Sequence, residues 1–152
     1  MKWLISIIIK LITGLFKKKE VPKPLGNEVD GNYIFQVLNR VQPSATHIYI
    51  SDSKYWLCTK QDIDAFLALD TTNKDNYQAE IHDCDDFSYR LMGQLSTPDW
   101  SGIAFGIVWT NTHALNCLID NDGKFWFVEP QSDKLLAELE PWQGNEILFI
   151  LM

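Results

Sequence analysis

Hydrophobic and polar positions divide the chain into an apolar N-terminal segment, a polar connection and a body of mixed periodicity. Residues 1–16 are largely apolar, whereas residues 17–32 contain prolines, glycines and charged residues and show no apolar period. Residues 33–152 carry both helical and strand-like patterns. Since a segment of this length can bury a hydrophobic core, we predict an N-terminal helix, a linker and one folded domain.

The first part of the body has the spacing of amphipathic helices. Apolar residues recur at helical intervals over residues 33–41, and Pro43 follows them closely. Thr59, with Asp62 three residues later, is typical of the start of a capped helix, which we expect to extend to about residue 69.

A third helix is predicted to begin near Asp83. Asp83 and Asp86 have the spacing of a capping box, and apolar residues then recur at i, i+3 and i+4 from Cys84 to Leu95. This periodicity places Cys84 on the inward face of the helix, close to its N-terminus.

The second part of the body is rich in aromatic and β-branched residues, which are typical of strands. Four strands are predicted in this part, at residues 103–109, 113–120, 125–129 and 147–152. Asn121–Gly123 is a strong hairpin signal, and two short extended segments, 47–50 and 55–58, come earlier. Helices followed by an antiparallel sheet predict the α+β class.

Charge is unevenly distributed along the chain. The net charge is −7, but residues 1–23 carry six lysines and one glutamate, so the rest of the chain is strongly acidic. An acidic body without a basic stripe argues against nucleic acid as the main partner. Three cysteines with no close pair suit a reducing compartment better than a disulfide framework.

Residues 1–19 combine an apolar helix pattern, a tryptophan near one end and three lysines at the other. This pattern is typical of an interfacial membrane helix, so we predict contact with a membrane surface, on the cytoplasmic side. The apolar stretch is short for a transmembrane helix. A helix that packs on the body or on a partner chain, and a signal peptide, are the alternatives.

Four residues have the types and the order of a thiol-based catalytic site: Gln78, Cys84, His113 and Glu129. Cys84 would be the nucleophile, activated by the helix N-terminus and by His113 as a base. Glu129 would orient the imidazole, and Gln78 would donate to an oxyanion. Taken singly, each residue has an ordinary structural explanation, such as a buried cysteine, a surface histidine, a strand-end glutamate or a loop glutamine.

Three blocks of sequence resemble a known family. They are Asp83–Phe87, then Ala104–Val108 with His113–Asn116, then Trp126–Gln131. The blocks, with the spacing from Gln78 to Cys84, resemble papain-like cysteine proteases, above all the papain-like C-terminal domain of a mushroom agglutinin and its bacterial and phage relatives. The resemblance implies a minimal papain-like fold and a calcium- or manganese-dependent thiol hydrolase with a Cys-His-Glu triad.

An acidic cluster surrounds the candidate thiol. His82, Asp83, Asp85 and Asp86 adjoin Cys84, and their carboxylates would raise the pKa of the thiol unless they are compensated. A hard cation such as Ca²⁺ or Mn²⁺ would provide that compensation. The alternative is that the aspartates only complement the positive end of the helix.

The sequence is compatible with three hypotheses, each from a different class of function. The first is a cysteine peptidase or amidase that acts on a peptide, a protein or peptidoglycan. The second is a catalytically inactive, membrane-tethered binding module, and the third is a cation-binding structural domain. The step from Cys84 to His113 is only 29 residues, which is short for papain-like enzymes and implies a substrate cleft that is shallow or is completed by a partner.

Overall fold

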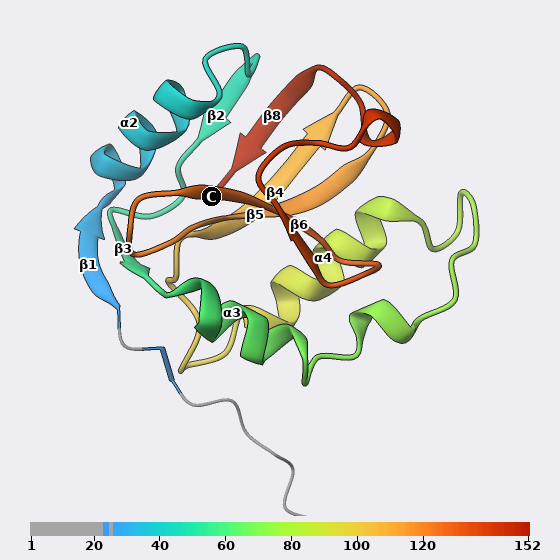
Figure 1. Ribbon diagram of the computed structural model, residues 1–152, viewed down its shortest axis with the longest axis horizontal. Helices are drawn as coiled ribbons and strands as arrows, with labels where there is room; N and C mark the ends of the chain where they lie inside the picture. The colour runs from blue at the N-terminus through green and yellow to red at the C-terminus, as the bar shows by residue number, and fades with distance from the viewer. Residues whose placement is uncertain (1–22, 25) are drawn as a thin grey trace, which may run out of the picture.

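The computed structural model describes residues 23, 24 and 26–152, which form an α+β domain as the sequence predicts (Figure 1). The predicted helix at residues 1–16 and residues 17–22 and 25 of the predicted linker lie outside the described residues. The expected membrane contact of residues 1–19 therefore stays a prediction. In the described part of the chain, every helix is too short or too polar to cross a bilayer.

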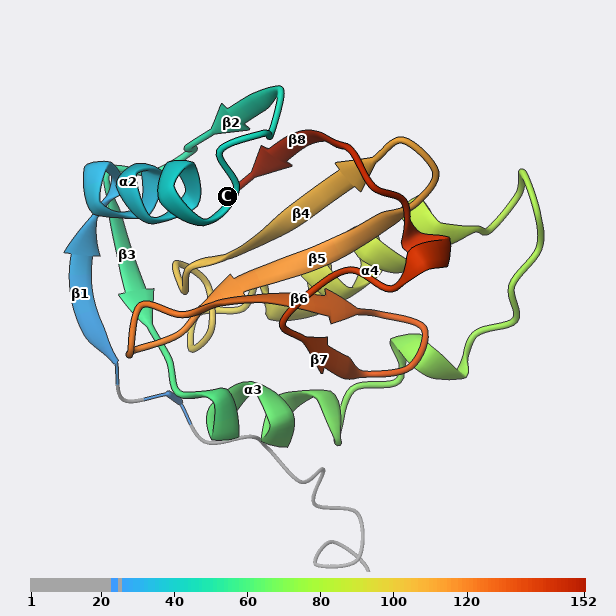
Figure 2. The same cartoon turned by 45° about the horizontal axis from the view of Figure 1, so that its top comes forward.

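A six-stranded sheet forms the centre of the domain (Figure 2). In spatial order its strands are β2 (His47–Tyr49), β8 (Ile147–Leu151), β4 (Phe105–Thr110), β5 (Ala114–Ile119), β6 (Phe125–Glu129) and β7 (Lys134–Leu136). Neighbouring strands are antiparallel except for β2 and β8, which are parallel. The sheet is therefore mixed, because the early strand β2 runs parallel to the C-terminal strand β8.

Two further strands lie outside this sheet. β1 (Asn27–Asp30) pairs with β3 (Lys54–Leu57) in an antiparallel ribbon. The lack of an apolar period in residues 27–32 predicts that they belong to the linker. In the structure they belong to the folded body, since residues 27–30 pair with β3 and residues 31 and 32 begin α2.

Three α-helices pack around the central sheet: α2 (Gly31–Val41), α3 (Lys60–Leu67) and α4 (Cys84–Leu95). The predicted caps are present, since Thr59 and Asp62 form a capping box at α3. Two short 3₁₀ helices, η1 (Thr72–Lys74) and η2 (Pro141–Gln143), were not predicted. Both are too short to show a periodic pattern in the sequence.

The sheet is covered on both faces, which explains why β5 is apolar along most of its length. Leu115, Cys117 and Ile119 pack in one core with α2, whereas Leu118 packs in a second core with α3 and α4. Side chains alternate between the faces of a strand, so each face receives every second residue. This packing places the beginning of α4 next to the end of the sheet where β5 begins.

Candidate functional site

The segment before α4 is a tight turn that delivers Cys84 to the surface of the sheet. The backbone groups of Gln78 and His82 bond each other at 2.8 and 2.9 Å, and Glu80 takes a left-handed conformation with φ 60°. The carboxylate of Asp86 then accepts from the backbone N–H of Asp83 at 3.2 Å. These contacts fix the position at which α4 begins, and with it the position of the Cys84 thiol.

Cys84 is partly buried, and its surroundings do not favour a thiolate. Burial raises the pKa of this thiol, and the carboxylates of Asp83 and Asp85 raise it further. Hydrogen bonds from backbone groups, above all at Ala114, act in the opposite direction without cancelling the increase. The prediction that the helix N-terminus activates Cys84 is therefore opposed by desolvation and by neighbouring negative charge.

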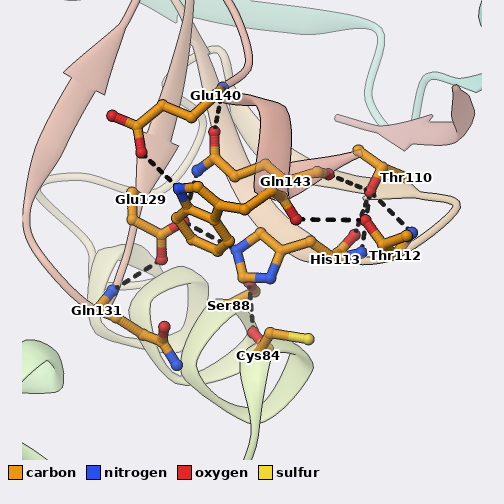
Figure 3. Close-up of polar contacts among 10 residues, drawn as sticks. Cys84, Ser88, Thr110, Thr112, His113, Glu129, Gln131, Glu140 and Gln143 are labelled. Atoms are coloured by element: carbon orange, nitrogen blue, oxygen red, sulfur yellow. Dashed lines mark hydrogen bonds and ion pairs between the residues drawn. The ribbon is translucent and has the colours of Figure 1, made fainter. Parts of the chain in front are cut away.

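His113 and Glu129 meet in a buried pair. The hairpin between β5 and β6 brings them together, and His113 Nε2 lies 2.8 Å from Glu129 Oε2 (Figure 3). His113 is 9% exposed and Glu129 is 3% exposed. Because the carboxylate holds one ring nitrogen, the imidazole has a fixed orientation.

Gln143 completes this network, although no pattern in the sequence selects it as a site residue. Its side-chain Nε2 donates to Glu129 Oε2 at 2.8 Å, and its backbone carbonyl accepts from the Thr110 hydroxyl at 2.6 Å. Gln143 is fully buried. Residues 141–143 show no periodicity or motif that links them to Glu129, so only the pairing of β8 with β4 brings them to the site.

Trp142 forms the exposed side of the same site. Its ring meets the imidazole of His113 edge to face, with ring centroids 4.8 Å apart, and its Nε1 donates to Glu140 at 2.6 Å. More than half of the Trp142 surface, 54%, is accessible to solvent. An exposed aromatic ring therefore adjoins a buried polar network.

The predicted residues are only partly connected to one another. Figure 3 shows Cys84 at the start of α4 beneath the His113 ring, but within the described residues no hydrogen bond joins the thiol to the imidazole. Gln78 is exposed, and its described contacts are the backbone bonds to the 81–82 turn. The structure thus assembles His113 with Glu129, and places Cys84 and Gln78 on nearby segments without a direct bond.

The predicted metal ligands do not all lie together: Asp83 and Asp85 lie beside Cys84, whereas Asp86 and His82 have other partners. Atoms of Asp83, Cys84 and Asp85 that could bind a metal lie within 4.8 Å of one another. A hydrogen bond between the two carboxyl groups lowers the pKa of Asp83 and raises that of Asp85. Asp86 instead caps the helix.

His82 also points away from this group, since its Nε2 lies 3.3 Å from the Asp75 carboxylate. Asp75 is in turn paired with Arg90 of α4. Ca²⁺ or Mn²⁺ binding at the start of α4 therefore stays a prediction from the sequence, now restricted to Asp83, Cys84 and Asp85.

Alkylation with iodoacetamide is expected to modify Cys84 well before Cys58 or Cys117. Cys58 and Cys117 are fully buried, and burial raises both thiol pKa values, that of Cys58 to about 12. Because the pKa of Cys84 is also raised, its labelling should be slow at pH 7 and accelerate above pH 9. Peptide mass mapping over time gives the order, and fast labelling of Cys84 at pH 7 would contradict the electrostatic description.

No protein-family model matches this chain, and no curated protein matches it. Similar folds occur among solved structures. The complex of PSL1a with E64 superposes with a TM-score of 0.70 at 20% identity, over 82% of this chain and 50% of the other. A Polyporus squamosus lectin bound to the human-type influenza-binding epitope Neu5Acα2-6Galβ1-4GlcNAc gives 0.65 at 20% identity, over 82% of this chain and 49% of the other.

These neighbours agree with the predicted resemblance to a mushroom agglutinin, at the level of the fold. This chain spans about half the length of each. The second neighbour is named as a lectin, and neither is described as a protease. The interpretation of the chain as a hydrolase of the papain-like thiol protease type is corrected accordingly: what the comparisons show is a fold shared with part of a lectin chain. Dependence on calcium and association with a membrane stay predictions from the sequence.

Proposed function

We propose that this chain is a ligand-binding module whose site includes Gln78, Cys84, His113 and Glu129, with Trp142 at its exposed side. The observation that carries the proposal is the buried network of His113, Glu129 and Gln143 directly beneath the exposed Trp142 ring. Buried polar networks that are fully bonded hold their members in one geometry. A rigid polar floor beside an exposed aromatic ring is a common arrangement in sites for small ligands.

The chemistry of the site favours a neutral, hydroxyl-rich ligand with one apolar face. Trp142 offers an apolar ring surface, and His113 offers a ring nitrogen beside it. The carboxylate of Glu140 accepts from Trp142, Asp83 and Asp85 flank Cys84, and the chain carries a net charge of −7, so the site disfavours anionic ligands. A neutral saccharide combines the required features, and lectin neighbours support this class.

The binding test uses three compounds and one matched pair of variants. Galβ1-4GlcNAc, its sialylated form Neu5Acα2-6Galβ1-4GlcNAc and E64 would be titrated into the full chain by calorimetry and by protein NMR. We expect the neutral disaccharide to bind more tightly than the sialylated form, because the site is acidic. Trp142→Ala should weaken binding about tenfold or more. Phe35→Ala, which removes a 43% exposed aromatic side chain on α2, should leave binding unchanged.

Two results would contradict the proposal. One is the absence of chemical-shift changes near Trp142 and His113 at millimolar concentrations of all three compounds. The other is cleavage of a peptide or of peptidoglycan that disappears in Cys84→Ser, because a binding module does not turn over its ligand.

A further inference from the structure

A second polar cluster lies where η1 adjoins the turn between β6 and β7, and its Asp133 is four residues beyond Glu129 of the proposed binding site (Figure 2). Asp70 is 9% exposed, and its carboxylate accepts from the backbone N–H of Thr72 at 2.7 Å. The amide of Asn73 donates through Nδ2 to Asp133 Oδ2 at 2.5 Å. Residues 60 positions apart in the sequence are thereby joined, and two aspartates share one small region.

Oxygen atoms without a partner are concentrated in this cluster. Among the described residues, five buried side-chain polar atoms have no hydrogen-bond partner, and three of them are Thr72 Oγ1, Asn73 Oδ1 and Asp133 Oδ1. Thr72 is fully buried. Buried polar groups almost always have a partner, so three unpartnered oxygens on Thr72, its neighbour Asn73 and the Asn73 partner Asp133 call for water or a bound group that satisfies them.

The composition of the cluster indicates the charge of that group. The Asn73 amide oxygen and an ionised Asp133 oxygen can only accept, and a hydroxyl oxygen can also accept. Asp70 and Asp133 supply negative charge to the same region. Carboxylate, amide and hydroxyl oxygens are the ligands preferred by Ca²⁺ and Mg²⁺. We propose that one divalent cation binds between Asp70, Thr72, Asn73 and Asp133, and joins η1 to the β6–β7 turn.

The charges of the cluster also favour a cation. The carboxylates of Asp70 and Asp133 lie close enough to repel each other when both are ionised, and Lys74 offsets this only in part. A cation between the two carboxylates would remove the repulsion at neutral pH.

The experiment uses the full chain, freed of metal with EDTA and dialysed. Ca²⁺ and Mg²⁺ would be titrated by calorimetry, and Ca²⁺ would be tested for displacement of Tb³⁺ luminescence. We expect saturable cation binding at this cluster and a higher melting temperature. Asp133→Asn should raise the dissociation constant about tenfold or more. Asp99→Asn, which changes an exposed carboxylate, should leave it within about twofold, and Asp83→Asn tests whether the candidate ligands at α4 hold the cation instead.

Melting of the metal-free variants shows whether Asp133→Asn still folds. Because the substitution removes the charge that faces Asp70, its melting temperature at pH 7 should equal or exceed that of the native chain, and the difference should disappear near pH 4. Two results would overturn the proposal: no saturable binding up to 10 mM of either cation, which would mean that water alone occupies the cluster, or binding lost in Asp83→Asn and kept in Asp133→Asn.

Discussion

Replacement of Glu129 by alanine is expected to lower the free energy of unfolding at pH 7 by about 3–5 kcal/mol. Glu129 accepts from His113 Nε2 and from Gln143 Nε2, both at 2.8 Å, and from the backbone N–H of Gln131 at 3.2 Å. The alanine variant leaves these groups without their acceptor. Each buried donor that loses its partner costs about 1–3 kcal/mol, so the loss is large for one residue.

Urea denaturation of the native chain and of two further variants would isolate this effect. Glu129→Gln keeps the shape and one oxygen acceptor, so it should cost less than alanine. Glu138→Ala removes a carboxylate from an exposed position and should change stability by no more than about 0.5 kcal/mol. If Glu129→Ala costs less than about 1 kcal/mol, the network does not hold the site together. The alanine variant should also lose saccharide binding, because His113 is no longer oriented.

Replacement of Leu91 by alanine is expected to destabilise the domain by about 2–5 kcal/mol. Leu91 is fully buried on α4 and packs in the core that contains Leu118 and Val128. Removal of its side chain takes contacts from both the helix and the sheet and leaves a cavity. Since α4 carries Cys84 at its first position, weaker packing of the helix should also increase the labelling rate of Cys84 by iodoacetamide.

Tyr89 provides the matched control on the same helix. Its side chain is 52% exposed, so Tyr89→Ala should change the free energy of unfolding by no more than about 0.5 kcal/mol. Denaturation curves of the two variants at one pH give the comparison. Similar losses in both would show that α4 is held by its surface contacts and not by the core.

Elements with a local cause were predictable from the sequence. The capping pairs at Thr59 and at Asp83 mark helix starts because the side chain and the backbone group that it satisfies are three residues apart. The hairpin signal at Asn121–Gly123 likewise sets the pairing of β5 with β6, which brings His113 to Glu129. These interactions join residues that are close together in the sequence. The α+β class was predictable for the same reason, because it follows from the order of elements with local patterns.

Long-range pairing decided the remaining features. Gln143 and Trp142 reach His113 because β8 pairs with β4, and the parallel pairing of β2 with β8 joins segments about a hundred residues apart. The cluster of Asp70 and Asp133 also depends on packing between distant turns. Hydrogen bonds of this kind leave no periodic pattern in the sequence, so neither Gln143 nor this second cluster could be selected as a site.

The chemistry of Cys84 shows most clearly where the sequence was insufficient. Residue types and their order determined that a cysteine would begin a helix near a histidine that a glutamate orients, and the structure has each of these parts. Only the tertiary structure decided the state of the thiol, because desolvation depends on what covers the sulfur and on which carboxylates face it. Burial and the neighbouring Asp83 and Asp85 raise the pKa of Cys84, whereas a helix N-terminus alone would lower it.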